Sequence, residues 1–168
     1  EGRAVIHCGG TGMTMERIGA EPKDWTTAAT FLGVADDLLP VVADQGVPVS
    51  PRSDITIGKV PSRINGYGQA SGIPEWTEHR TTDAEIAQWS ADQRYAMGIQ
   101  CRRVRALDID IADPVVAQEV ADIFQGAIGV RCSRRSRSNS GKRLLAFRVA
   151  GSLSKAVLKV GTEKIELL

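Results

Sequence analysis

Apolar and charged residues alternate in the segment Val104-Arg105-Ala106-Leu107-Asp108-Ile109-Asp110-Ile111. Alternation with a period of two predicts a β-strand that buries one face. The leucine and the two isoleucines then face the core, and Asp108 and Asp110 project together from the opposite face. Their Cα atoms are expected to lie about 6–7 Å apart.

Two carboxylates on one strand face suggest metal chemistry. Such a pair can hold one or two divalent ions, and ions about 3.5–4 Å apart are the usual device for in-line phosphoryl or nucleotidyl transfer. The alternative is an edge strand whose two acids are simply solvated and which runs into the turn Ala112-Asp113-Pro114. The strand by itself leaves both interpretations open.

Two helices and a short strand are predicted upstream. Asp24 is a candidate N-cap for the first helix, which the apolar run Val34–Val42 is expected to extend towards a turn. Thr82 and Glu85 form a candidate capping box at the start of the second helix. Met97–Gln100 is predicted to be a strand.

The segment from Pro48 to Trp76 is rich in proline and glycine, which predicts a long irregular loop. Lys59 and Arg63 lie in this segment, where flexible neighbours suit contact with phosphates. An ordinary surface loop is the alternative on composition alone.

A helix is predicted to follow the acidic strand, with Pro114 at its start. We expect it to pack on the sheet through its apolar side chains. These are Val115, Val116, Val120, Ile123 and Phe124.

The remaining chain predicts three strands, over Ala127–Arg131, Arg143–Val149 and Lys164–Leu168. A mobile basic loop is expected over Arg134–Gly141, and the last strand contains Glu166. The order along the chain is therefore a carboxylate pair, a basic glycine-containing loop and a third carboxylate.

Bulk properties predict a cytoplasmic globular protein. The chain has 168 residues, of which 42% are hydrophobic and 24% charged, values typical of one folded domain. No apolar run approaches the roughly 18 residues needed to cross a bilayer, and Glu1–Thr14 is too polar for a signal peptide. We therefore expect no membrane association, a flexible leader over residues 1–24 and a folded domain over residues 25–168.

Cysteine and histidine exclude several function classes. Cys8, Cys101 and Cys132 are widely separated, which argues against a disulfide framework or a zinc site. The only histidines, His7 and His79, are isolated, so a histidine triad or histidine-rich metal site is not expected. Acid–base chemistry would depend on carboxylates or water.

The charge distribution predicts a polyanionic partner. The formal net charge is only +1, but no acid occurs between Asp122 and Glu163. The basic residues in that window are Arg131, Arg134, Arg135, Arg137, Lys142, Arg143, Arg148, Lys155 and Lys159. Such a block suits binding to a polyanion, and a solvated basic loop is the alternative.

Several short motifs occur in an order that resembles a known family. They are Gly58-Lys59-Val60-Pro61-Ser62-Arg63, the spaced Trp76 and Trp89, Met97-Gly98-Ile99, Ala106-Leu107-Asp108-Ile109-Asp110, and Asn139-Ser140-Gly141-Lys142-Arg143-Leu144-Leu145-Ala146-Phe147-Arg148. Together they resemble the bifunctional DNA primase/polymerase domain of the archaeo-eukaryotic primase superfamily, in the form encoded by phages and prophages. The resemblance runs from about Trp25 to the end of the chain.

The resemblance implies an α/β (α+β) fold, with a mixed or antiparallel sheet that carries the acids on one face and helices on the other. Asp108 and Asp110 resemble the family's first motif, and Glu166 after Ile165 resembles its third. These three acids would hold Mg²⁺ or Mn²⁺. The implied activity is template-directed nucleotidyl transfer from an NTP or dNTP to a 3′ hydroxyl.

The second motif of the family normally supplies a serine and a histidine to the nucleotide phosphates. Ser140 fits the serine, but Leu144 stands at the histidine position. We expect Lys142, Arg143 or Arg148 to supply the missing positive charge. The DNA template and primer are expected to contact the other basic residues, namely Lys59, Arg63, Arg134, Arg135 and Arg137.

The resemblance also implies a larger protein with an attached helicase domain. Further strands normally follow the third motif, so we expect this chain to be a fragment truncated after Glu166. Two other functions fit the same residues. A metal-dependent nuclease would use the three acids with Lys164, and a non-catalytic nucleic-acid-binding module would use the basic loop and ignore metal.

Overall fold

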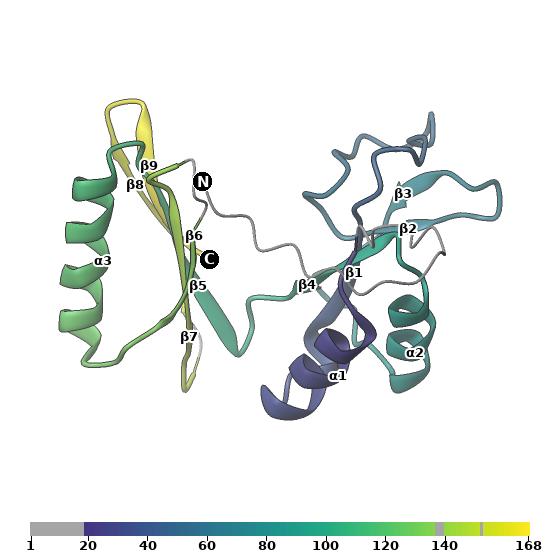
Figure 1. Cartoon of the computed structure of the whole chain (residues 1–168), viewed down its shortest axis with the longest axis horizontal. Helices are drawn as coiled ribbons and strands as arrows, with labels where there is room; N and C mark the ends of the chain where they lie inside the picture. The colour runs from purple at the N-terminus through teal and green to yellow at the C-terminus, as the bar shows by residue number, and fades with distance from the viewer. Residues whose placement is uncertain (1–18, 137–139, 152) are drawn as a thin grey trace, which may run out of the picture.

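The computed structural model describes residues 19–136, 140–151 and 153–168 of the chain. It is an α+β structure, which confirms the predicted class. Helices and antiparallel strands form two groups that lie side by side in Figure 1, with a five-stranded sheet in one and two two-stranded sheets in the other. None of the described helices is long and apolar enough to cross a membrane.

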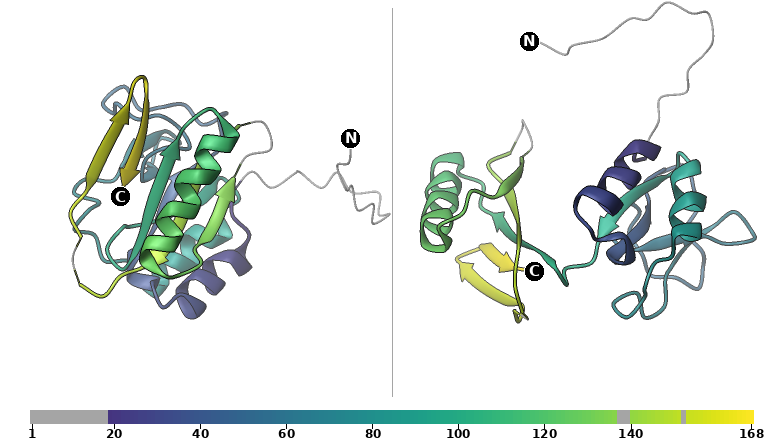
Figure 2. Two further views of the ribbon diagram at one scale, coloured as in Figure 1. Left: turned by 90° about the vertical axis from the view of Figure 1, so that its left-hand side faces the viewer. Right: turned by 90° about the horizontal axis from the view of Figure 1, so that it is seen from below.

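The five-stranded sheet has the order β6-β7-β5-β9-β8, with every neighbouring pair antiparallel. Its strands are β5 (Val104–Asp110), β6 (Ser133–Ser136), β7 (Arg143–Arg148), β8 (Ala156–Val160) and β9 (Glu163–Leu167). Strand β5, which carries Asp108 and Asp110, therefore lies at the centre of the sheet. The β8–β9 hairpin forms the part of the sheet on one side of β5 (Figure 2).

Helix α3 (Pro114–Ile128) covers one face of this sheet. Asp113 caps it by accepting hydrogen bonds from the N–H groups of Val115 and Val116, at 2.8 and 3.2 Å. Ala117 and Ala121 of the helix are buried against the central strand. Small side chains at these positions let the helix lie close to the sheet.

The predicted packing of α3 is correct for two of its five apolar residues. Val120 and Phe124 contact the core, but Ile123 is 73% exposed, and Val115 and Val116 are also exposed. A helix buries positions three and four apart, so once Ala117 and Ala121 face the sheet, these three side chains turn towards solvent.

The prediction of a strand over Ala127–Arg131 is wrong. Helix α3 continues to Ile128 and ends at Gly129, whose φ of +66° suits a glycine beyond the last helical turn. The next strand, β6, begins at Ser133 and occupies part of the segment expected to be a loop. Hydrogen bonding to β7 orders these basic residues despite their exposure.

The other group of elements is built around helix α1 (Pro22–Phe31), helix α2 (Asp83–Ala91), strand β1 (Leu38–Val42) and strand β4 (Tyr95–Ile99). The prediction that Val34–Val42 extends the first helix is wrong. Gly33, at φ +60°, follows the helix end, and after a short 3₁₀ turn β1 pairs with β4. Every residue of β1 is buried, and an apolar run without periodicity does not distinguish strand from helix.

The predicted start of α1 also needs correction. Pro22 begins the helix, so Glu21 is the N-cap residue and Asp24 lies in the first turn. There the Asp24 carboxylate accepts a hydrogen bond from the Glu21 N–H at 3.0 Å. The capping box of Thr82 and Glu85 at α2 is confirmed.

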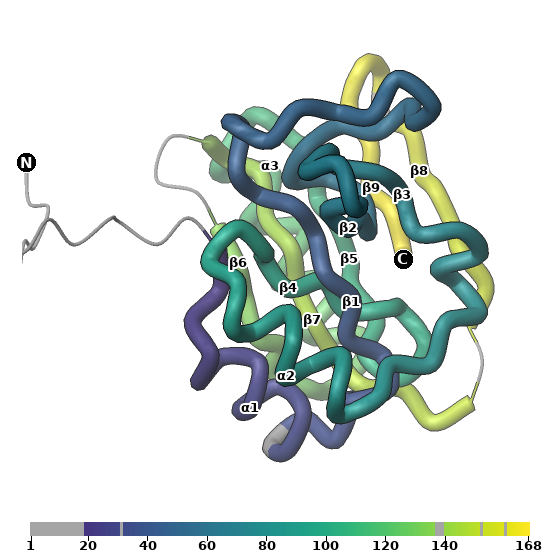
Figure 3. Tube along the Cα trace, turned by 90° about the vertical axis from the view of Figure 1, so that its right-hand side faces the viewer, coloured from purple at the N-terminus to yellow at the C-terminus, as the bar shows by residue number. Residues whose placement is uncertain are grey.

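The long segment between β1 and α2 is less irregular than predicted, because strands β2 (Ser62–Ile64) and β3 (Ala70–Gly72) form a small hairpin within it. Figure 3 shows this hairpin and its loops beside β1.

A buried carboxylate joins the two groups. Asp37, only 1% exposed, accepts hydrogen bonds from Arg102 at 2.6 Å and from Arg103 at 2.8 Å, both in the turn that leads from β4 into β5. Arg148 of β7 adds a hydrogen bond of 2.8 Å to the carbonyl of Leu32 at the end of α1. These contacts fix where the central strand begins.

Candidate functional site

One face of the five-stranded sheet carries Asp108, Asp110 and Glu166, and we call it the acid face. The two aspartates project away from α3, because Leu107 and Ile109 are buried on the helix side. This confirms the alternation predicted for the strand. Glu166 lies directly opposite Asp108 on β9. The sheet therefore places the third predicted acid beside the first.

The strand register also defines the neighbours of these acids. Leu144 of β7 lies opposite Asp108 on its other side, and Arg135 of β6 lies opposite Leu144. Lys164 of β9 lies opposite Asp110. Residues directly opposite in antiparallel strands share a face. The acid face is therefore a mosaic of acidic and basic side chains, in which the direct cross-strand neighbours of Asp108 are Leu144 and Glu166.

Two of the three carboxylates are neutralised by lysines. The Lys142 Nζ lies 2.5 Å from Asp110 Oδ1, the Lys164 Nζ lies 2.6 Å from Glu166 Oε2, and the Lys155 Nζ lies 3.2 Å from Glu166 Oε1. The hydrogen bonds from Lys164 and Lys155 lower the pKa of Glu166. The same contact with Glu166 raises the pKa of Lys164.

Asp108 is in a different state. No residue that the structure describes forms a hydrogen bond or ion pair with its carboxylate. Partial burial raises its pKa, and the nearby charges of Asp110 and Glu166 raise it further. Asp108 is thus the acid on this face whose negative charge is least compensated.

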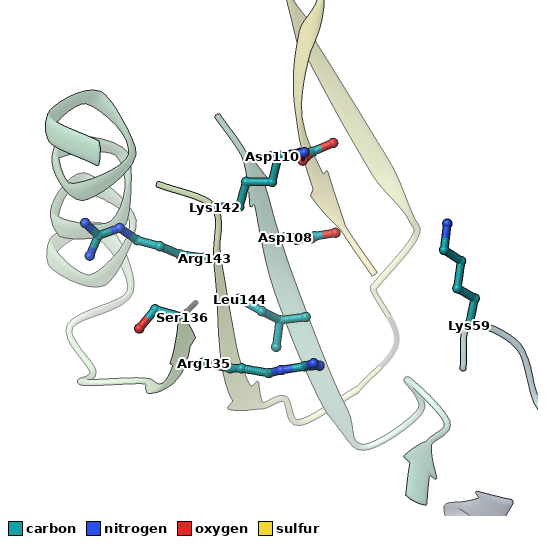
Figure 4. Close-up of a pocket in the computed structure, with 8 residues that line it drawn as sticks. All are labelled: Lys59, Asp108, Asp110, Arg135, Ser136, Lys142, Arg143 and Leu144. Atoms are coloured by element: carbon teal, nitrogen blue, oxygen red, sulfur yellow. Dashed lines mark ion pairs between the residues drawn. The ribbon is translucent and has the colours of Figure 1, made fainter. Parts of the chain in front are cut away.

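The acid face forms one wall of an open pocket with a volume of about 420 Å³. The residues around it include Lys59, Asp108, Asp110, Arg135, Lys142 and Leu144. In Figure 4 the two aspartates point to the side on which Lys59 stands, and Lys59 comes from the other group of elements. The pocket therefore combines carboxylates with cations from three separate segments.

A tight turn places Lys59 at the pocket. Gly58 adopts a φ of +78°, which favours glycine, and donates its N–H to the carbonyl of Val42 at 2.8 Å. The Lys59 N–H bonds to the Thr56 carbonyl at 3.1 Å. The turn is thus anchored to the end of β1.

A close backbone approach places Lys142. A Cβ atom on Gly141 would clash with the carbonyl oxygen of Ala112 and would lie 2.9 Å from the nitrogen of Pro114. Only glycine allows the loop before β7 to lie this close to the end of β5. Lys142 consequently reaches Asp110.

The residues present fit a divalent cation in part. Asp108 and Asp110 offer the oxygen ligands that Mg²⁺ and Mn²⁺ prefer, and a cation would offset both the burial and the repulsion from Asp110 and Glu166 that raise the pKa of Asp108. Among the residues the structure describes, however, no three Asp, Glu, His or Cys side chains are already arranged to hold a metal. For Asp110 to bind the metal ion, its ion pair with Lys142 would have to break, and for Glu166 to bind it, the ion pairs with Lys155 and Lys164 would have to break.

Two predicted arginines turn their side chains towards α3, although Arg143 is also among the residues that line the pocket. Arg143 and Arg134 both donate to the side-chain carbonyl of Gln118 on α3, and Arg143 also donates to the carbonyl of Pro114 at 3.1 Å. Figure 4 shows Arg143 pointing towards the helix. Arg137 lies outside the described residues.

The other predicted residues are dispersed. Arg148 is engaged with Leu32, and Arg63 is exposed on β2. The Ser140 hydroxyl accepts a hydrogen bond from the backbone N–H of Lys142 at 3.2 Å. The structure therefore brings Lys59, Arg135 and Lys142 to the acids, with Ser140 supporting the loop.

The strand predicted over Lys164–Leu168 corresponds to β9, but β8, which begins just after Lys155 and carries Lys159, and the hairpin that joins it to β9 were not predicted from the sequence. The sequence does contain a signal for this hairpin. The pair Gly161-Thr162 lies between two five-residue strands, and Gly161 has a φ of +63°, as a two-residue hairpin turn requires. Recognising this turn would have placed Lys159 and Lys164 opposite one another.

Comparison of the chain with protein-family models, with curated proteins and with solved structures found no match.

Proposed function

We propose that the chain is a primase-polymerase catalytic domain, which joins nucleotides on a DNA template in a reaction that needs Mg²⁺ or Mn²⁺. The observation that carries the proposal is the position of Asp108. It has Asp110 on its own strand, Glu166 directly across on β9, and neither an ion pair nor a hydrogen bond to its carboxylate from any described residue, although the charges of Lys164 and Lys142 act on it from a distance. An uncompensated carboxylate between two others suits metal binding better than it suits stability.

The roles of the acids follow from this arrangement. Asp108 and Asp110 would hold the metal ions, and Glu166 would complete the ligand set after release from its lysines. The bound ions would activate the primer 3′ hydroxyl and neutralise the triphosphate of the incoming nucleotide.

The basic residues of the pocket would hold phosphates. Lys142 lies beside Asp110, and Arg135 and Lys59 reach the same pocket from β6 and from the turn after β1. Lysine and arginine remain charged at neutral pH and bind phosphate without a histidine. Leu144 lies beside Asp108 and cannot serve this purpose.

A non-catalytic nucleic-acid-binding module is the second candidate, and one observation favours it. Asp110 and Glu166 both form ion pairs with lysines, so that the acid face is largely neutralised without a metal. Such a module would bind DNA with a steep dependence on salt and would ignore divalent ions.

Primer extension separates the candidates. The chain is incubated with a labelled primer–template and dNTPs or NTPs in Mn²⁺ or Mg²⁺, beside an Asp108→Asn variant. We expect metal-dependent extension that follows the template and is lost in the variant. Shortening of the primer without added nucleotides would indicate a nuclease, and binding without any reaction would indicate the module.

A further inference from the structure

The inner side of the β8–β9 hairpin continues the acid face. Because Asp110 pairs with Lys164, and Lys164 pairs in turn with Lys159 on β8, the three side chains share one face. Lys155, just before β8, reaches Glu166 on the same side. We call Lys155, Lys159 and Lys164 the hairpin lysines.

The pairing of Lys159 with Lys164 is unfavourable for the fold. Like charges directly opposite one another in an antiparallel pair destabilise the sheet. Lys164 is compensated by Glu166, whereas Lys159 is exposed and has no ion pair with any residue of the described part of the chain. Because the Lys159–Lys164 pair does not stabilise the sheet, these lysines are expected to have another function.

We propose that the hairpin lysines bind the sugar-phosphate backbone of a nucleic-acid strand as it passes the pocket. The inference rests on the proposed function for the identity of the polyanion. Three observations support it. The lysines are continuous with the acid face, Lys155 and Lys164 keep 61% and 43% of their side-chain surface exposed, and helix α3 lies on the opposite side of the sheet.

Lysines on an edge strand have another explanation, since a charge on an exposed edge prevents strands from adding to the sheet. The order of the strands makes β8 an edge. Edge protection requires a charge of either sign on β8, however, and it does not require a second lysine opposite on β9. Charge reversal at position 159 therefore distinguishes the two explanations.

The test is Lys159→Glu, with Lys23→Glu as the matched control because Lys23 is an exposed lysine on α1. Binding of a labelled oligonucleotide is measured by fluorescence anisotropy over a range of salt concentrations, without nucleotide or divalent metal. Replacing one phosphate-binding lysine by a neutral residue makes the slope of log K against log salt shallower by about 1. Lys159→Gln should show that change, and Lys159→Glu should weaken binding further.

Thermal stability is the second readout, and it is expected to change in the opposite direction to nucleic-acid binding. In Lys159→Glu the new carboxylate would lie opposite Lys164, so this variant is expected to have a higher melting temperature and weaker nucleic-acid binding. Loss of folding cannot produce this combination. A wild-type-like affinity in Lys159→Glu, an equal loss in Lys23→Glu, or no binding by the wild type would overturn the inference.

Specificity for nucleic acid is tested by competition. Polyglutamate of the same charge should displace the oligonucleotide poorly, and equal competition would overturn the assignment to nucleic acid. A different result would contradict the proposed function, namely nucleotide binding that does not depend on metal. The oligonucleotide assay contains no nucleotide and no divalent metal, so a failure of the hairpin inference can be distinguished from a failure of the proposed function.

Discussion

Asp108 lies directly opposite Glu166 across the β5–β9 pairing, and the two carboxylates are in opposite electrostatic states. Lysines lower the pKa of Glu166, whereas burial and neighbouring acids raise the pKa of Asp108. Glu166 forms ion pairs with Lys155 and Lys164, whereas the Asp108 carboxylate has no ion pair with a described residue. Glu166 therefore contributes to the stability of the sheet, and Asp108 is the acid to which we assign the proposed metal binding.

Asp108→Asn should stabilise the protein at neutral pH while it abolishes metal-dependent binding. A carboxylate whose pKa is raised by folding destabilises the native state when it is ionised, so the gain is present at pH 7 and fades as the pH falls and wild-type Asp108 is protonated. Removing a like charge from a cross-strand pair is worth about 0.2–1 kcal/mol. Thermal unfolding at pH 7 and pH 4 measures the effect.

Asp110→Asn is the matched control for that prediction. Asp110 is paired with Lys142, so its loss leaves an unpaired lysine and no gain in stability is expected. Equal stabilisation by both substitutions would contradict the distinction between the two aspartates.

Asp37→Ala should be strongly destabilising. The substitution leaves Arg102 and Arg103 without the buried carboxylate that they share, and breaking a buried ion pair from one side costs about 3–5 kcal/mol. Urea unfolding compares this variant with Asp54→Ala, which alters an exposed acid. A cost no larger than that of the surface substitution would show that this junction does not hold the two groups together.

Gly141→Ala should move Lys142. The added methyl group meets the backbone of Ala112 and Pro114, which cannot move aside as a flexible side chain would, so a cost of about 1–3 kcal/mol is expected. Nucleotide affinity should fall as well. Gly126→Ala in α3 is the control, because a Cβ there meets nothing within 4 Å and alanine is the better helix former.

Lys142→Ala should change metal and nucleotide affinity in opposite directions. Without its ammonium, Asp110 becomes free to bind Mn²⁺, so affinity for the metal alone should rise. Affinity for a nucleoside triphosphate should fall by roughly tenfold, equivalent to about 1.4 kcal/mol. Isothermal titration measures both. A parallel fall in the two affinities would indicate general damage to the loop instead.

The central strand was predictable because alternation at Leu107, Asp108, Ile109 and Asp110 reports both the conformation and the exposed face. Strand β1 was not, since Leu38–Val42 is buried on both faces and carries no periodicity. The helix after Pro114 was predictable in position but not in orientation. Its contact face is defined by alanines, which a search for large apolar residues overlooks.

For the candidate site, the acids could be identified from sequence but their partners could not. Ion pairs such as Lys164 with Glu166 depend on strand register, which a single sequence does not specify. Neighbouring basic residues also point to opposite faces. Arg135 reaches the pocket, whereas Arg134 turns to α3, and a count of positive charge does not separate them.

The metal–nucleotide site on the acid face is tested most directly by the binding of a labelled nucleoside triphosphate with and without Mn²⁺, compared between the native chain and an Asp108→Asn, Asp110→Asn double variant. We predict that native binding requires the metal and is lost in the double variant, while the variant retains a cooperative thermal transition. Equal nucleotide binding by both proteins, or binding indifferent to Mn²⁺, would contradict the assignment of the acid face as a metal–nucleotide site.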